Sequence, residues 1–457
     1  MRRIGFPHVM LALGLSTPAF AQSVHNVSSG TLQSYATIQQ AVDQAADGDA
    51  LLVTAGTYDP FLVQGKSLAI FAMPGQVVVV APSSGASSAI AIQIDAIGPQ
   101  QCVVLSGLNA QHGVGFPLQS QVPLRVTNSG GSVFFQDGTF SANELSWYDV
   151  NCNSYGGADG AQLVDAQRVT FTDCAITGGA GSYTDDVCVG QGASSGPGGE
   201  ALACTGSSVA LYGCTLSGGL GGGFPGQNSG ALWGGGALSL TGSTAFASGT
   251  SFVGGPGGND GFITGSGGVG AFVAAGSELR RLDCVVAGGP GQPNGMPIAG
   301  QGFDTTLGGG ARTLNFPSVA WWGRPGKATF HGAAGDVVYH LKSLSTRFQV
   351  LPESGVLHVA PPLPFPAPEG TVPSSNRLVT QLDFTSLSPT PITAAVAVQG
   401  FAFAASGRRR LANVRHQLAI DPTSGPDCNG NGINDYVDLL AGFSSDADGD
   451  LIPDECP

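Results

Sequence analysis

Charged residues are scarce in this chain. Its 457 residues include 17 Lys and Arg and 31 Asp and Glu, so 11% of the side chains are charged, against about 25% in an average soluble domain. A net charge of −14 with so few basic residues excludes a phosphate-binding surface, and with it nucleic acid as a partner. Hydrophobic residues still make up 42% of the chain, which excludes the composition of disordered proteins.

Long apolar runs are also missing. No run of about 18 apolar residues follows the N-terminus, so no transmembrane segment is expected. The N-terminus itself has two arginines, then the apolar stretch Val9–Leu15, then the small–x–small sequence Ala19-Phe20-Ala21. This order predicts a signal peptide over residues 1–21, cleaved before Gln22. The mature protein should therefore be extracellular or bound to the cell surface, where disulfides are permitted.

Glycine is abundant, with 72 residues, and it accompanies internal repeats. Four segments can be aligned with one another: residues 168–179, 208–219, 244–255 and 278–289. A fifth, residues 146–157, precedes them. Their equivalent positions are Cys152, Cys174, Cys214, Thr250 and Cys284, spaced by 22, 40, 36 and 34 residues. A second strand precedes each of the later units, at residues 200–204, 236–240 and 270–274. Such uneven spacing is tolerated by a coil of stacked strands whose turns are lengthened by loops, and it predicts an all-β solenoid.

The start of the mature chain predicts how this coil begins. Residues 34–48 indicate a short helix ending at Gly48, with a capping box from Thr37 to Gln40, and a strand follows at Ala50–Val53. The run YATIQQAVDQAADGDALLVTAGTYD closely resembles the entry of right-handed parallel β-helices of the pectate-lyase-like superfamily, in which an amphipathic helix plugs the first turn. The resemblance implies a right-handed parallel β-helix with an N-terminal capping helix over residues 22–312.

The cysteine column has two interpretations. Stacked thiols bind soft metals, but a single thiol in each turn and the interruption at Thr250 favour small residues that fill an inward stack. Cys188 and Cys204 flank one loop and are candidates for a disulfide. The positions just before the column are of types that tolerate a left-handed backbone, so they predict a tight turn rather than a row of catalytic carboxylates. These positions are Asn151, Asp173, Gly213, Gly249 and Asp283.

Glycine-rich excursions leave the coil at one position, so they are expected on one side of it. They span residues 178–199, 218–236, 254–270 and 288–310. The aromatic residues on them either stack against sugar rings or pin each loop to the coil. The candidate ligand-binding residues are Tyr183, Phe224, Trp233 and Phe262.

Catalysis is the alternative function. The resemblance to the pectate-lyase-like superfamily implies polysaccharide lyase or glycoside hydrolase activity, which needs clustered carboxylates, or a basic residue to abstract a proton. The weak candidates are Asp185 and Asp186 in the first long loop and Arg280 and Arg281 on the last strand, where the arginines can equally form a solvated edge. No strand column collects acids on successive turns, so a noncatalytic role is favoured.

The chain changes character near residue 313. Glycine becomes rarer, and short alternating strands over residues 313–422 predict a small antiparallel β-sandwich. Its histidines, His331, His340, His358 and His416, lie on separate strands. They are expected to be scattered surface residues rather than a metal site.

The tail, residues 427–457, has eight acids and no Lys or Arg. In the first run, oxygen ligands stand at loop positions 1, 3, 5, 9 and 12, with glycine at 6 and a main-chain carbonyl at 7, as a calcium loop requires. The second run repeats positions 1, 3, 5 and 9, but Leu451 replaces the glycine, which puts this site in doubt. The predicted calcium ligands are Asp427, Asn429, Asn431, Ile433, Asp435 and Asp438, then Asp446, Asp448, Asp450, Ile452 and Asp454.

These runs resemble thrombospondin type 3 and dockerin-like calcium repeats, and their sequence is closer to that of the type 3 repeats. Cys428 and Cys456 bracket the tail, and a disulfide between them would add about 3 to 4 kcal/mol. The whole sequence predicts an exported, calcium-binding, noncatalytic β-helix protein whose glycine-rich loop face binds a carbohydrate or surface ligand. A polysaccharide lyase or hydrolase and a structural envelope protein are the alternatives.

Overall fold

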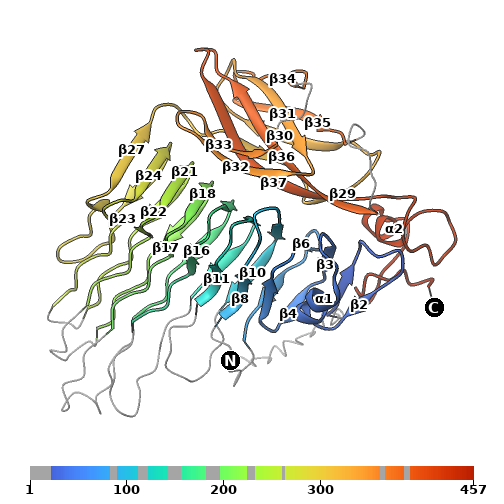
Figure 1. The fold of residues 1–457 in the computed structure, drawn as a ribbon, viewed down its shortest axis with the longest axis horizontal. Coiled ribbons are helices and arrows are strands. Elements are labelled where there is room, and N and C mark those ends of the chain that lie inside the picture. The colour runs from blue at the N-terminus through green and yellow to red at the C-terminus, as the bar shows by residue number, and fades with distance from the viewer. Residues whose placement is uncertain are drawn as a thin grey trace, which may run out of the picture.

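A computed structural model describes residues 22–82, 90–111, 122–142, 156–181, 196–223, 232–259, 263–360, 366–384 and 392–456. The predicted signal peptide lies outside these residues. In the described part the chain is all-β, as expected, with two short helices. Most strands wind through three long parallel sheets, so the architecture is compatible with a β-helix-like fold (Figure 1).

Successive strands pass from sheet A to sheet B to sheet C, and each turn stacks on the one before. Sheet A contains β2 (Ser34–Tyr35), β1 (Val24–Asn26), β3 (Ala50–Val53), β6 (Leu68–Ala72), β9 (Cys102–Ser106), β12 (Ser132–Gln136), β15 (Val169–Thr172), β18 (Ser208–Tyr212), β21 (Thr244–Ser248), β24 (Glu278–Leu282) and β27 (Phe303–Leu307). Sheet B contains β4 (Gly56–Tyr58), β7 (Val78–Val80), β10 (Leu108–Gln111), β13 (Thr139–Ser141), β16 (Ala175–Thr177), β19 (Thr215–Ser217), β22 (Ser251–Val253) and β25 (Val285–Ala287). Sheet C contains β5 (Phe61–Gln64), β8 (Ile90–Asp95), β11 (Val122–Thr127), β14 (Ala161–Val164), β17 (Leu202–Thr205), β20 (Leu238–Thr241), β23 (Ala271–Val273) and β26 (Ile298–Gly300).

Helix α1 (Ile38–Gln44) lies at the start of the coil. The Thr37 hydroxyl accepts a hydrogen bond from the Gln40 amide at 3.1 Å, as the capping box predicted. The helix ends at Gln44 rather than at Gly48, which instead forms a turn with φ +95° before β3. Buried Ile38 and Val42 belong to the core inside the coil, so α1 shields the first turn from solvent.

The turn from sheet A to sheet B is left-handed at one residue, as predicted. Asp173, Gly213, Gly249 and Asp283 have φ between +52° and +62°. The expected fifth repeat is wrong, however, because Gln136 pairs with Thr172 and so places Gly138, not Cys152, opposite Cys174. Asn151 and Cys152 lie outside the described residues, between β13 and β14.

The cysteine column is structural. Cys174 and Cys214 are free and buried, and the Cys174 thiol donates to the carbonyl of Thr172 at 3.3 Å. Thr250 makes the same bond to Ser248 at 3.3 Å, which explains why threonine replaces cysteine there. Cys204 is also free and buried inside the coil, because it pairs with inward-facing Leu163 and Leu240. The candidate disulfide between Cys188 and Cys204 is therefore excluded, and Cys188 lies outside the described residues.

The glycine-rich excursions begin and end in a regular structure, which we call the glycine array. In the described residues it comprises 178–181, 196–199, 218–223, 232–236, 254–258, 265–270 and 288–295. Each excursion has an outgoing limb, which leaves the coil, and a returning limb, which re-enters it. Outgoing and returning limbs alternate along the array. Their main chains are joined by hydrogen bonds, as from Gly219 N to Gly199 O (2.9 Å) and from Gly235 N to Gly219 O (2.8 Å). A Gly-Gly-x period of three, as in Gly254-Gly255-Pro256, is typical of polyproline II chains, which have three residues per turn.

The remaining strands form a second layer against sheet A. A three-stranded sheet contains β28 (Thr313–Asn315), β30 (Gly326–His331) and β35 (Arg377–Leu382). A five-stranded sheet contains β29 (Val319–Trp321), β37 (Arg409–Ile420), β36 (Thr393–Phe403), β31 (Val337–Ser343) and β34 (Gly370–Thr371), and β32 (Thr346–Leu351) pairs with β33 (Gly355–Val359). A separate core lies between the two sheets, with Phe330 and Val398 among its members.

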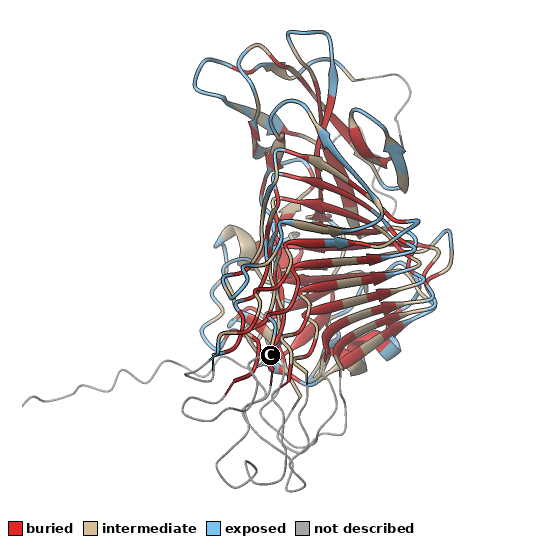
Figure 2. Ribbon diagram, turned by 90° about the vertical axis from the view of Figure 1, so that its left-hand side faces the viewer, coloured by how far each residue is buried: buried red, intermediate tan, exposed pale blue. Residues whose placement is uncertain are grey.

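The five-stranded sheet covers the outer face of sheet A. Phe71, Val104 and Phe134 of sheet A share a core with Val414 and Leu418 of β37. Figure 2 shows that the strands of the coil are buried along most of their length. The strands of sheet A from β3 to β21 are thus mostly buried on both faces, whereas the last two, β24 and β27, are partly exposed. The other exposed sides of the coil carry sheet C and the glycine array.

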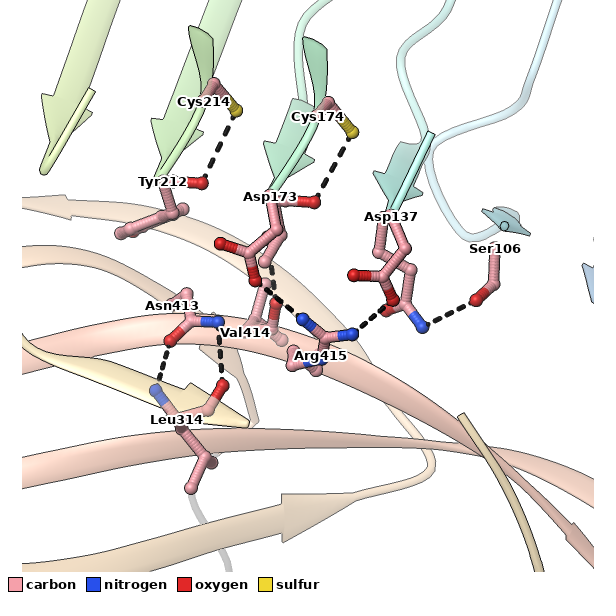
Figure 3. A network of polar contacts seen from close by, with 12 residues as sticks. Ser106, Asp137, Asp173, Cys174, Tyr212, Cys214, Leu314, Asn413, Val414 and Arg415 are labelled. Carbon is pink, nitrogen blue, oxygen red and sulfur yellow. Dashed lines mark hydrogen bonds and ion pairs between the residues drawn. The ribbon is translucent and has the colours of Figure 1, made fainter. Parts of the chain in front are cut away.

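Polar contacts fix this packing (Figure 3). Arg415 of β37 forms ion pairs with Asp173, at 2.6 Å, and with Asp137 of the preceding turn. Gln136 exchanges two hydrogen bonds of 2.8 Å with the main chain of His416. The two aspartates occupy the left-handed turn position, so the turn geometry presents their carboxylates to Arg415.

Three of the four histidines expected on the surface are buried. His340, His358 and His416 are at most 2% exposed, whereas His331 is exposed. His358 and His416 both contact Phe134, between the second layer and sheet A. Their rings fill this interface, so the expectation of solvated histidines is wrong for these three.

The buried histidines predict acid sensitivity. Burial lowers the pKa of His340 to about 4 and the pKa values of His358 and His416 to about 3, from 6.5. The unfolded chain therefore binds more protons below pH 6.5, and each such histidine reduces the free energy of unfolding by about 1.4 kcal/mol per pH unit. We expect stability, measured by chemical denaturation, to fall steeply from pH 6.5 to 4. The His358→Gln/His416→Gln variant should show a shallower slope; an unchanged slope would contradict this account.

Candidate functional site

The first tail loop winds around one carboxylate. Asp427 accepts hydrogen bonds from the amides of Asn431 at 3.0 Å and Gly432 at 2.9 Å. The Asn431 side chain accepts from the Ile433 amide at 2.7 Å. Gly432 has φ +84°, the left-handed conformation that glycine adopts without strain.

The second loop repeats this geometry. Asp446 accepts from the amides of Asp450 at 3.0 Å and Leu451 at 3.1 Å, and Asp450 accepts from Ile452 at 2.8 Å. Leu451 adopts the left-handed conformation, φ +64°, in place of glycine, and its side chain is buried. Carboxylate oxygens of Asp446, Asp448 and Asp450 lie within 4.8 Å of one another. The leucine therefore does not change the loop, because burial of its side chain offsets the cost of the backbone conformation.

Position 9 is also equivalent in the two loops. Asp435 accepts from the Cys428 amide, and Asp454 accepts from the Ala447 amide at 3.0 Å. Burial and then the charges of nearby acids, Asp427 and Asp438 among them, raise the pKa of Asp435. Such mutual repulsion is relieved by a cation.

Asp438, at position 12, lies on α2 (Asp435–Ala441) and is fully buried. One of its oxygens accepts from the Asn431 amide group at 2.8 Å, whereas the other, Oδ1, is buried without a hydrogen-bond partner. A buried carboxylate oxygen without a partner is costly. The donor set, made only of oxygens, fits a calcium ion.

Cys428 and Cys456 form a disulfide, with 5.7 Å between their Cα atoms. Both sulfurs are thus excluded as metal ligands, although they lie near Asp435. The bond holds the end of the chain beside the first loop, as expected from the bracketing of the tail by these cysteines.

The tail packs on the N-terminal strands of sheet A. Tyr436 and Leu451 are buried in the same core as Val27, and Figure 1 shows α2 beside the first strands. The Tyr436 hydroxyl lies 3.4 Å from Nδ1 of His25, and the Ser23 hydroxyl donates to the carbonyl of Asp450 at 3.4 Å. The two calcium-type loops are therefore joined to the beginning of the coil.

Of the other candidates, the described residues include only Arg280, Arg281 and Trp233. Arg280 and Arg281 form ion pairs with Glu278, at 2.6 Å, and Asp304, at 2.7 Å, on sheet A. The Trp233 side chain is 58% exposed, so burial does not pin its limb to the coil. Tyr183, Asp185, Asp186, Phe224 and Phe262 lie outside the described residues.

A pair of acids on adjacent turns was missed by the sequence analysis. Asp159 and Glu200 are equivalent because Ala161 of β14 pairs with Leu202 of β17. The Glu200 amide donates to Asp159 at 3.0 Å, and the Gln162 amide group donates to the other Asp159 oxygen at 2.8 Å. The pair lies just before the strands, a position that the search for acids along the strand columns did not cover. The signal available in the sequence was that each acid lies two residues before a strand of sheet C.

Glu200 is electrostatically unusual. Burial, and then the charge of Asp159, raise the pKa of Glu200 to about 7. Its Oε2 atom is buried without a hydrogen-bond partner. Arg125, on the preceding turn, donates to Gln162 at 2.8 and 3.1 Å. The raised pKa leaves Glu200 partly protonated near neutral pH, next to the Asp159 carboxylate.

Comparison with known proteins does not assign the chain to a family: no protein-family model matches it, and no similar curated protein is found. In the described residues, the helices are too short and polar to cross a membrane.

Proposed function

We propose that the chain is an exported right-handed parallel β-helix protein, similar to the pectate-lyase-like superfamily, with a β-sandwich over residues 313–422 and a calcium-binding tail. Its role is noncatalytic: the side of the coil that carries the glycine-rich loops binds a carbohydrate or cell-surface ligand. The observation that carries this proposal is the glycine array, which holds the bases of the loops in one hydrogen-bonded lattice.

The array favours binding because it fixes the limbs at the bases of the loops before the ligand arrives. Ordering a loop on binding lowers affinity, and a prebuilt scaffold avoids that loss. Most of sheet A is covered by the second layer, whereas Trp233 projects from the array into solvent. An exposed indole offers an apolar face to a sugar ring.

The test is binding of the mature chain, from Gln22, to a panel of acidic and neutral polysaccharides in calcium, measured by affinity electrophoresis. Trp233→Ala should weaken binding to the best ligand about tenfold, the loss of about 1.4 kcal/mol that removal of one aromatic contact produces. Phe303→Ala removes another exposed aromatic side chain, on sheet A, and should have no effect. Absence of binding across the panel by folded protein would overturn the proposal.

A polysaccharide hydrolase or lyase is the second candidate, and the Asp159–Glu200 pair is the observation that favours it. Glu200 would donate its proton to the leaving oxygen of a glycosidic bond, and Asp159 would act as the ionised partner. Since the donor must be protonated, activity should fall as the pH rises through about 7.

The same panel, read for new reducing ends and unsaturated products, tests this candidate. Glu200→Gln should reduce product formation more than 100-fold, the contribution expected of a general acid. Glu353→Gln, an exposed substitution in the second layer, is the control. A folded wild-type chain that binds without forming product would exclude this candidate and leave the binding proposal standing.

A further inference from the structure

We propose that Glu455 is a further ligand of the first calcium loop, so that this site is assembled from both tail repeats. The inference rests on the proposed calcium binding by the tail. It adds one ligand that the loop pattern does not contain, since Glu455 lies 17 residues beyond Asp438 and stands at position 10 of the second loop, which is not a ligand position.

The first loop needs such a ligand. Calcium loops of this type end in a glutamate at position 12 that binds the ion through both oxygens. Asp438 stands there instead, one methylene shorter and fixed on α2. Its Oδ2 accepts from the side-chain amides of Asn431, at 2.8 Å, and Asn429, at 3.3 Å, so it points at loop positions 5 and 3. Its Oδ1, fully buried, has no partner.

Glu455 reaches the same point from the other repeat. Its Oε1 accepts from the Asn429 side-chain amide at 3.1 Å and from the Ser444 hydroxyl at 2.5 Å. The Asn429 amide nitrogen thus lies within hydrogen-bonding distance of both the Asp438 and the Glu455 carboxylates. Two carboxylates and a position-3 amide therefore meet at one place in the first loop.

The disulfide explains why Glu455 is there. Cys456, the next residue, is bonded to Cys428, which directly precedes Asn429. Asp454, on the other side, belongs to the second loop through its bond to the Ala447 amide. Consecutive residues therefore serve different loops, so folding of the second loop places a ligand in the first.

The first quantity to measure is the number of calcium ions bound per chain. Calorimetric titration of the mature, disulfide-bonded chain should show that it binds two ions. In Glu455→Gln, one site should weaken at least tenfold while the other keeps its affinity, and Glu455→Asp should recover part of the loss. Glu353→Gln should titrate like the wild type.

The outcomes separate this inference from the proposal on which it rests. If the wild type binds no calcium, the calcium proposal itself is wrong. If the wild type binds two ions and Glu455→Gln is indistinguishable from it, or if both sites weaken equally, the assignment of Glu455 to the first loop is wrong. Amide exchange of α2 in each variant shows whether the tail is still folded.

Discussion

Gly219→Ala is expected to unfold much of the glycine array. A Cβ atom at this position would lie 1.9 Å from the carbonyl oxygen of Gly179, which is itself in the array. Because both sides of the contact are main chain, no side chain can move to make room. The same limb bonds to Gly199 and Gly235, so a shift here breaks the lattice in both directions. We expect a loss of about 4 kcal/mol or more, in the range reserved for severe core substitutions.

The measurement is chemical denaturation combined with amide exchange. The Gly199 carbonyl accepts the Gly219 amide, so that amide should lose protection first. Gly30→Ala is the matched control, because a Cβ there meets only Ile392, at 3.9 Å. A Gly219→Ala protein as stable as the control would show that the limbs do not pack as described.

The array shows why part of the structure was not predictable. The Gly-Gly-x triplets at 218–223 and 254–258 are visible in the sequence and indicate an extended chain with a period of three. Which limbs bond to which depends on the stacking of turns, and therefore on sheet register. The register predicted at Cys152 is wrong. The residue opposite Cys174 on the preceding turn is Gly138, and a glycine at this position gives the alignment no cysteine to follow.

The packing of the second layer had a clearer signal. Leu68–Ala72 is an uninterrupted apolar strand, and such runs indicate burial on both faces rather than alternation. If the outer face of this strand were in solvent, an apolar side chain would be expected only on the inner face. Ile70 points into the core of the coil, and Phe71 points outward into the core shared with the second layer. The covering layer was thus implied by the sequence, although the partner strands were not. The ion pair from Arg415 to Asp137 and Asp173 joins residues more than 240 positions apart, which no local pattern reports.

The spacing of the tail encodes the shape of its loops directly. Positions 1 and 9 accept equivalent main-chain hydrogen bonds in both runs, whereas calcium binding by these residues stays a prediction. What spacing did not show is where the tail lies. Leu451, a departure from the calcium pattern, is buried beside Val27, so the residue that weakens the motif is the one that joins the tail to the first strands.

This position of the tail predicts the effect of removing calcium. If the ions hold both loops in the conformation that buries Tyr436 and Leu451, ion binding and docking on β1 are linked and stabilise each other. At calcium 100-fold above the dissociation constant, one site stabilises the docked state by about 2.7 kcal/mol. Chelation should therefore expose β1 (Val24–Asn26) while leaving the middle of the coil, such as β15, protected.

Hydrogen exchange followed by mass spectrometry measures this difference directly. The amides of Val24–Asn26 should exchange about 100-fold faster in chelator than in calcium, which corresponds to the same 2.7 kcal/mol. Asp446→Asn should exchange fast in both conditions, because it removes the carboxylate around which the second loop winds. Asp304→Asn, on sheet A far from the tail, should respond to chelator like the wild type. Protection of β1 that is unaffected by chelator in a chain shown to bind calcium would mean that the tail docks without its ions.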